Sequence, residues 1–418
     1  QARYGGLPFP YETPLDPMTF RSRLILYALL TSLTSLSIDA LLPGLRQIGL
    51  ELGVAPPLST HHVISLFIFG MAFGELVIGP LSDAFGRKQA LLGGLCVYLL
   101  GTVVALFAQS LEMVLIGRFL QGIGVSGPKI ATRAMIRDQF EGDAMARVMS
   151  FMFTLFILVP MLAPALAQGL IALAGWRSVF VAYFVIAVVL GAWVAARHPE
   201  TLPVARRIPF RPRLLFLNAR RILSSPRVTL LIIATGLVFG AQLLYLSTAA
   251  DLFFEAYGVT ESFPLYFAAL ALAMGLASFI NARLVQRLGV VTMARAGFIG
   301  LTAVSLLMMI ATLGAEVVLP FAVFLTLLSL AFFAIGILFG NLNALAMQTL
   351  GNVAGFGASL IASGSSLVAT LFAVGFGGFY SGDTTYLAVG FFAAGLSSLV
   401  LAEIAIRRSE SPVVSVTL

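Results

Sequence analysis

The chain has 418 residues, of which 59% are hydrophobic and 10% are charged, and its mean hydropathy is +1.01. Ordinary globular chains carry about 25% charged residues, so this composition excludes a soluble protein. The net charge of +7 comes from basic residues at the ends of apolar runs, without interleaved aromatics, and indicates membrane orientation more than nucleic-acid binding. The single cysteine, Cys96, lies inside an apolar run, which excludes a disulfide framework.

The N-terminal segment is polar and rich in proline, and it contains Glu12 and Asp16. It does not read as a signal peptide, because no basic region precedes a short apolar core and a small-residue cleavage site. We therefore expect residues 1–21 to form a tail and the first apolar run to direct insertion.

Twelve apolar runs follow, each long enough for a helix that crosses a bilayer. Isolated strands cannot satisfy their backbone groups in lipid, so all twelve are predicted to be helices. The runs cover residues 22–44, 60–81, 90–109, 111–135, 146–172, 176–196, 227–250, 262–284, 291–313, 317–344, 353–378 and 384–406.

Lysine and arginine concentrate in alternate connections, and acidic residues dominate the opposite set. The positive-inside rule then places both termini in the cytoplasm. Residues 197–227 carry eight arginines, and we interpret 197–226 as a cytoplasmic linker that contacts anionic lipid. It separates bundles of six helices at 22–196 and 227–406, with a C-terminal tail at 407–418.

The two bundles read as a duplicated unit. The stretch at residues 281–289 follows the eighth span as the stretch that begins at Gly79 follows the second span. Gly289 then corresponds to Gly86, at an offset of 289 − 86 = 203 residues. Repeated halves with a substrate path between them are a known transporter architecture. The predicted fold class is therefore an all-α membrane protein with twelve spans in two pseudo-symmetric bundles.

A short charged connection follows the second span. It reads Gly79-Pro80-Leu81-Ser82-Asp83-Ala84-Phe85-Gly86-Arg87-Lys88. We predict a tight cytoplasmic turn, and the stretch closely resembles the loop signature of the major facilitator superfamily. The resemblance implies the twelve-helix fold of that family and a transport function.

Two further stretches resemble the twelve-span drug:proton antiporters, Asp39-Ala40-Leu41-Leu42-Pro43 and Arg118-Phe119-Leu120-Gln121-Gly122. Two more resemble the bicyclomycin/chloramphenicol-resistance branch of that family, Arg133-Ala134-Met135-Ile136-Arg137-Asp138 and Pro160-Met161-Leu162-Ala163-Pro164. Pro160 and Pro164 in the fifth span imply antiport. The chain departs from that pattern at Ala163 and at Ala167-Gln168, where paired glycines are usual, so an uptake symporter or uniporter stays open.

Four ionisable residues lie within the first six spans and none lies deep in the last six. An ionisable group at mid-membrane costs about 2.5–3.5 kcal/mol, so each is expected to be paired or functional. With a rise of about 1.5 Å per residue, Asp39 and Arg118 lie at similar depth near the outer side, and Glu75 and Lys129 lie deeper. We predict that these four residues line the substrate cavity.

Asp39 is interpreted as a proton carrier that responds to the approach of Arg118, or as one half of a static ion pair with it. Arg118 is assigned to coupling or cavity lining. The resembling branch usually has glutamine at Glu75 and a small residue at Lys129. These two are either a compensating structural pair or a site for protons or for a polar or charged substrate group.

Two further groups complete the candidate sites. Gln242 and Tyr245 lie one turn apart on the seventh span and are predicted to line the cavity from the second bundle. A conformational latch at the inner ends of spans two and four is assigned to Gly79, Asp83, Gly86, Arg87, Arg133 and Arg137, with Arg133 or Arg137 as the candidate partner of Asp83.

Neither a metal cluster nor an arrangement typical of an enzyme is found in the sequence. We expect a monomer in the bacterial inner membrane whose partners are protons, lipid and a small-molecule substrate. The proton gradient takes the place of a cofactor. The expected activity is proton-coupled efflux of small amphipathic compounds. The alternatives are uptake of a metabolite, export of an endogenous metabolite or siderophore, and a sensor without transport.

Overall fold

The computed structural model describes residues 18–54, 58–313, 318–348, 354–380 and 383–408. Within these ranges it contains twelve helices of 20 or more residues, ten of which are long and apolar enough to cross a membrane. The first group is α1 (Phe20–Asp39), α3 (His62–Phe85), α4 (Arg87–Leu106), α5 (Leu111–Gln139), α6 (Gly142–Ala174) and α7 (Arg177–Arg197). The second is α9 (Pro226–Asp251), α10 (Phe263–Leu288), α11 (Val290–Leu313), α12 (Phe321–Met347), α13 (Ala354–Gly377) and α14 (Thr385–Arg407).

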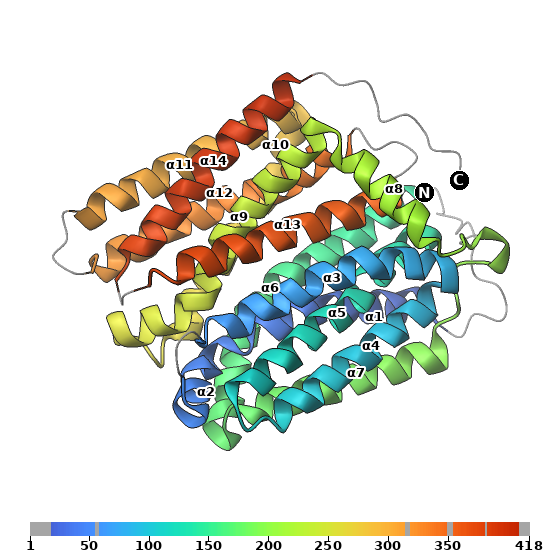
Figure 1. The fold of residues 1–418 in the computed structure, drawn as a ribbon, viewed down its shortest axis with the longest axis horizontal. Coiled ribbons are helices and arrows are strands. Elements are labelled where there is room, and N and C mark those ends of the chain that lie inside the picture. The colour runs from blue at the N-terminus through green and yellow to red at the C-terminus, as the bar shows by residue number, and fades with distance from the viewer. Residues whose placement is uncertain (1–17, 55–57, 314–317, 349–353, 381–382, 409–418) are drawn as a thin grey trace, which may run out of the picture.

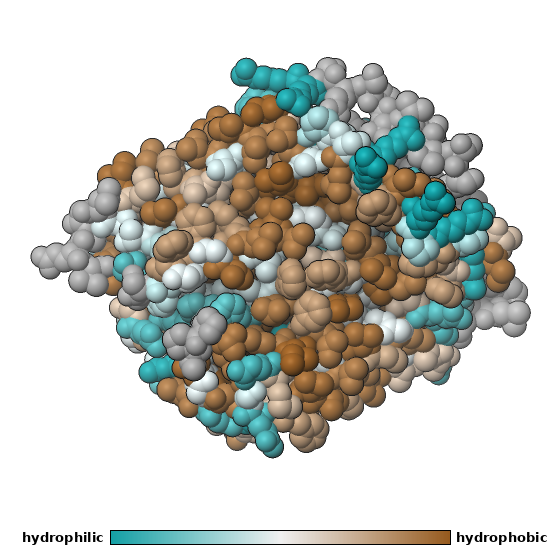
Figure 2. All heavy atoms as spheres, in the orientation of Figure 1, coloured by the Kyte–Doolittle hydropathy of each residue, from teal (hydrophilic) through white to brown (hydrophobic). Residues whose placement is uncertain are grey.

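The all-helical membrane fold predicted from the sequence is confirmed. Helices α3, α4, α5 and α7 pack together with α1 and α6, and helices α9 to α14 form the second group. The two groups lie side by side in Figure 1 and meet where α3 packs on α13 and α6 packs on α10. Figure 2 shows hydrophobic side chains over the middle of this face and hydrophilic ones mainly near the helix ends, as lipid contact requires.

Three local features differ from what the sequence predicted. The first span ends at Asp39 instead of residue 44, because Pro43 has no N–H to bond the carbonyl four residues earlier. A short helix that the sequence did not predict, α2 (Leu45–Leu52), follows it. Helix α3 also continues through Pro80 to Phe85, so most of the predicted turn is helical.

The turn itself is a single residue. Gly86 joins α3 to α4 with φ of 110°, and Gly289 joins α10 to α11 with φ of 80°. These backbone angles favour glycine, which has no Cβ to clash. A glycine with positive φ thus joins two helices in each bundle, at an offset of 203 residues (289 − 86), which agrees with the predicted duplication.

Glycines also bring α5 unusually close to its neighbours. A Cβ at Gly122 would collide with the backbone of Phe67 on α3, and one at Gly124 would collide with the backbone of Tyr98 on α4. Close backbone approach of this kind is how membrane helices gain packing contacts. Helices α3, α4 and α5 are thereby held together.

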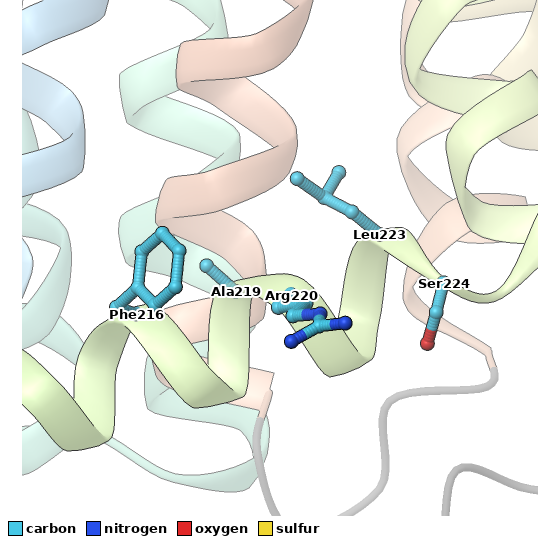
Figure 3. Close-up of a pocket in the computed structure, with 5 residues that line it drawn as sticks. All are labelled: Phe216, Ala219, Arg220, Leu223 and Ser224. Carbon is cyan, nitrogen blue, oxygen red and sulfur yellow. The ribbon is translucent and has the colours of Figure 1, made fainter.

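The linker contains a helix that was not predicted, α8 (Pro212–Leu223). Its exposed residues include the arginines Arg213, Arg220 and Arg221 and the hydrophobic residues Phe216, Leu217 and Leu223. Figure 3 shows a pocket lined only by residues of this helix and the following Ser224, with Phe216 and Leu223 projecting toward the same side. Helix α8 and α2 lie at opposite ends of the molecule in Figure 1. The predicted tails, 1–21 and 407–418, lie mostly outside the described residues.

Candidate functional site

Asp39 lies at the last residue of α1, where the break before Pro43 ends the helix. Its side chain is only 6% exposed, and it makes no hydrogen bond or ion pair with any residue that the structure describes. It lies within electrostatic range of Tyr183 on α7 and Tyr245 on α9. A buried carboxylate without a partner is costly in a membrane, which marks Asp39 as a functional candidate.

Tyr245 brings a polar group of the second bundle toward Asp39. The side chain is fully buried, and its hydroxyl has no hydrogen-bond partner among the described residues. The Tyr245 ring stacks on the ring of Phe267, with 6.3 Å between the ring centroids, and meets the ring of Phe332 edge-on, with 5.1 Å between the centroids. Gln242, one turn earlier, is half-buried and contacts Met274 within its own bundle, at 3.9 Å between Nε2 and Sδ.

Arg118 on α5 is fully buried and joins three helices. Its guanidinium donates to the carbonyl of Ser37 on α1 at 2.9 Å and to the carbonyl of Val63 on α3 at 3.1 Å. It also donates to Gln121 Oε1 at 2.9 Å and lies over the ring of Phe67. The ion pair with Asp39, one of the two interpretations from the sequence, is not formed in this structure.

Neutral residues that the sequence analysis missed extend this cluster. The Ser37 hydroxyl and the Tyr98 hydroxyl lie 2.7 Å apart, and Gln121 Nε2 donates to Thr102 Oγ1 at 2.8 Å. Gln121 follows Arg118 by three residues, so helical spacing could have indicated that contact. Nothing in the sequence indicated Tyr98.

Glu75 on α3 and Lys129 on α5 form an ion pair, as one interpretation of the sequence required. Glu75 is fully buried and Lys129 is 17% exposed. Lys129 Nζ also contacts Met71 Sδ at 3.4 Å. The second carboxylate oxygen of Glu75 accepts from the hydroxyl of Ser366 on α13 at 3.2 Å, so the pair reaches across to the second bundle.

The predicted latch has different partners from those expected. Asp83 pairs with Arg87, and Arg87 Nε donates to Asp138 Oδ2 at 3.0 Å. All three belong to the first bundle. Neither Arg133 nor Arg137 forms an ion pair with Asp83, because the side chain of Arg87, at the start of α4 just across the Gly86 turn, occupies its carboxylate. Contact with the second bundle occurs instead at Gly79, where an added Cβ would collide with the Ser359 hydroxyl of α13.

Glu200, in the linker, was missed by the sequence analysis. Its carboxylate accepts from the backbone N–H groups of Arg87 at 2.9 Å and Lys88 at 3.1 Å. An acidic side chain at a helix N-terminus satisfies unpaired N–H groups and favours the helix dipole. The linker also contacts Asp83 directly, because the backbone N–H of Ile208 donates to the backbone carbonyl of Asp83 at 3.0 Å. The linker thus fixes the start of α4.

Replacing Asp83 by Asn should slow turnover with little change in substrate affinity. The change removes the carboxylate that holds Arg87, but it touches none of the buried groups around Asp39 or Glu75. Loss of such a contact shifts the balance of conformations. Single-turnover exchange and equilibrium binding measured on the same preparation test this, and a large loss of affinity with normal exchange would contradict it.

The opposite end of the molecule is closed by contacts between the bundles. His61 Nε2 lies 2.6 Å from Asp251 Oδ2, and the ring of His61 packs edge-on against Tyr380. The hydroxyls of Ser65 and Ser247 are 3.2 Å apart nearby. Gln168 of α6 donates to the carbonyl of Thr260 at 3.3 Å.

Both prolines of the predicted antiporter motif lie inside α6, the helix that packs on α10 of the second bundle. Proline cannot donate within the helix, so each leaves a carbonyl one turn earlier without its usual bond. Pro164 is buried. Among the residues that the structure describes, no group of three or more His, Cys, Asp or Glu is arranged to hold a metal ion.

The sequence model of the Major Facilitator Superfamily matches residues 27–373. Together with the helical architecture, this match shows that the chain belongs to that superfamily of membrane transporters. The resemblance inferred from the Gly79–Lys88 stretch is thereby confirmed. The chain is a multi-pass membrane transporter and is not an enzyme.

The most similar proteins include named drug-resistance transporters. The chain is 30% identical over 268 residues to a bicyclomycin resistance protein homolog of Haemophilus influenzae, which covers 64% of this chain and 67% of the relative. It is 31% identical over 172 residues to the multidrug resistance protein MdtL of Salmonella heidelberg, covering 41% of this chain and 43% of the relative. The solved D-xylose-proton symporter has the same fold, with a TM-score of 0.68 at 14% identity over 91% of this chain and 96% of that one.

Proposed function

We propose that this transporter is a proton-coupled antiporter that expels small amphipathic compounds from the cytoplasm by alternating access. The observation that carries the proposal is the buried Asp39 carboxylate, which has no partner among the described residues and lies within range of the unpartnered Tyr245 hydroxyl of the other bundle. A carboxyl group in this position can take up a proton, and the site between the bundles can take up substrate. Competition between the two would couple their movements in opposite directions.

The charge distribution supports this assignment of roles. The buried charged residues that the structure describes all belong to the first bundle: Arg23, Asp39, Glu75, Arg87 and Arg118. The second bundle contributes buried hydroxyl and amide groups. We therefore assign proton coupling to the first bundle, with Asp39 as the group that takes up the proton and Arg118 as a fixed cation that joins α1, α3 and α5. Glu75 is a second candidate for protonation.

Alternating access requires the contacts between the bundles to open in turn. The His61–Asp251 contact and the Ser65–Ser247 contact close one end in this structure. By the positive-inside rule, that end is the outer one and both termini lie in the cytoplasm of a bacterium, with the protein in the inner membrane. The basic helix α8 then lies at the cytoplasmic surface, where each arginine near anionic lipid contributes about 1 kcal/mol to membrane contact.

The names of the relatives suggest which compounds to test first as substrates. One carries the name of a bicyclomycin resistance protein and another that of a multidrug resistance protein. We therefore propose drugs as substrates, with endogenous metabolites or siderophores as alternatives. The protein is expected to work as a monomer with no cofactor other than the proton gradient.

Flux measurements in proteoliposomes test the direction of transport. A pH gradient is imposed, and movement of a panel of labelled amphipathic compounds that includes bicyclomycin is followed. Antiport predicts substrate movement opposite to the protons. Movement with the protons would establish a symporter, which the unusual Ala167-Gln168 sequence leaves open, and flux indifferent to the gradient would establish a uniporter. Absence of flux in both directions would indicate a sensor.

A further inference from the structure

The two members of the Glu75–Lys129 pair differ in what a ligand can reach. Glu75 is fully buried, and both of its carboxylate oxygens are occupied, one by Lys129 and the other by the Ser366 hydroxyl at 3.2 Å. No part of the Glu75 side chain is exposed, so a cationic ligand has no direct access to it. Glu75 is therefore poorly placed to recognise a cation.

Lys129 has the opposite character. Its ammonium group has three donors, of which one bonds Glu75 and another is directed to the sulfur of Met71 at 3.4 Å, a weak acceptor. The side chain is 17% exposed. One donor of Lys129 is thus available to an acceptor that enters from outside the pair.

Arg133 places a second cation beside it. It follows Lys129 by one turn on the same face of α5, is exposed, and makes no hydrogen bond or ion pair with any residue that the structure describes. It lies within electrostatic range of Glu75. The three side chains Glu75, Lys129 and Arg133 carry formal charges of −1, +1 and +1, which leaves this region with one positive charge in excess.

The facing helix of the second bundle supplies neutral hydrogen-bond donors. Ser359, Ser363, Ser366 and Thr370 on α13 follow spacings of 4, 3 and 4 residues, which puts their hydroxyls on one helix face. All four are buried, and this face meets α3 at Glu75 and Gly79. Ser366 already donates to Glu75, and Thr370 donates to the Ser366 carbonyl at 2.9 Å, so the donors left for a ligand are the hydroxyls of Ser359 and Ser363. Hydroxyl donors beside a cation suit a carboxylate, which accepts up to four hydrogen bonds and donates none when ionised.

We propose that Lys129, Arg133 and the hydroxyl face of α13 form a subsite for a carboxylate group, so that the transported compounds are amphipathic organic anions. This inference rests on the proposed transport function and names the substrate class of the same central region. Arg133 attracts the anion from the inner side, and Lys129 binds it without breaking the Glu75 bond.

Three compounds with one ring system and different charge test the proposal: 1-naphthylacetate, 1-naphthylacetamide and 1-naphthylethylamine. Their dissociation constants are measured on the purified protein in detergent. The unaltered protein should bind the carboxylate about tenfold more tightly than the amide, and the amine most weakly. Tighter binding of the amine, or equal affinity for the three, including no binding of any at millimolar concentration, would overturn the subsite.

Substitutions test which residues cause the preference for the carboxylate compound. Arg133→Gln should weaken binding of the carboxylate several-fold and leave binding of the amide unchanged. The double variant Glu75→Gln with Lys129→Gln removes one charge of each sign, keeps the local net charge, and should bring the carboxylate to the affinity of the amide. Arg283→Gln removes an exposed arginine of α10 and is the matched control. A carboxylate preference that survives in both variants would contradict the assignment.

The same compounds separate this inference from the proposed antiport. Binding that prefers the carboxylate, without gradient-driven flux in proteoliposomes, would remove antiport and keep the subsite. Gradient-driven flux of the amide or amine, without preference for the carboxylate, would keep antiport and remove the subsite. Thermal unfolding of every variant in detergent shows whether a loss of binding reflects a loss of fold.

Discussion

Replacing Asp39 by Asn should abolish transport driven by a pH gradient while leaving the protein folded and inserted. The amide has nearly the same size as the carboxyl group but cannot carry a proton. Because the carboxylate has no hydrogen-bond or ion-pair partner among the described residues, its removal breaks no contact that stabilises the bundle. The measurement is flux in proteoliposomes under an imposed pH gradient, together with thermal unfolding in detergent.

Exchange of labelled for unlabelled substrate in the absence of a gradient should persist in the Asp39→Asn variant, since it needs no net proton movement. Glu112→Gln is the control, because Glu112 is an exposed acid in the first turn of α5 in the same bundle. It should retain wild-type flux. If the Asn variant kept the pH-dependent flux of the wild type, Asp39 would have no part in coupling.

Removing one member of the Glu75–Lys129 pair should destabilise the protein strongly, and removing both should restore much of the loss. A single change strands the other charge in a medium of low dielectric constant, which typically costs about 3–5 kcal/mol of unfolding free energy. The variants are Glu75→Gln, Lys129→Ala and their combination. A double-mutant cycle on thermal stability in detergent measures the coupling.

Additive losses in that cycle would mean that the two charges do not interact in solution. Ser366→Ala is the matched control for the second oxygen of Glu75, because it removes one hydrogen bond and leaves the ion pair intact. This variant should lose about 1.5–3 kcal/mol of unfolding free energy, the usual contribution of a hydrogen bond to a charged group. A stable double variant that still fails to bind one class of compound would place the pair in the binding site.

Most of the fold could be predicted because hydropathy alone marks helices that must satisfy their own backbone in lipid. Ten of the predicted spans meet the length and hydropathy expected of membrane helices, while α5 and α6 were recognised in sequence through weaker patterns. What hydropathy does not report is where a helix ends. Pro43 stopped α1 early, whereas Pro80 lay inside α3, and a short amphipathic helix such as α8 leaves no apolar run.

The candidate site could be predicted only in its charged members. Buried charges stand out in an apolar sequence, and helical rise placed Glu75 beside Lys129 correctly. It also placed Asp39 near Arg118, but depth does not fix rotation about the helix axis, and the Arg118 guanidinium is taken by backbone carbonyls. Ser366 lies 291 residues from Glu75, and a common residue type at such a separation gives no signal before the bundles are packed.

The glycine contacts of α5 have a consequence for how the molecule moves. Helices α3, α4 and α5 touch backbone to backbone at Gly122 and Gly124, which leaves them little freedom to slide or tilt against one another. These three helices should move as one rigid body throughout the transport cycle. Lys129 on α5 and Glu75 on α3 should therefore keep their positions relative to each other. The contacts that must break and form again during transport are then Ser366–Glu75 and His61–Asp251, because both connect the first bundle to the second.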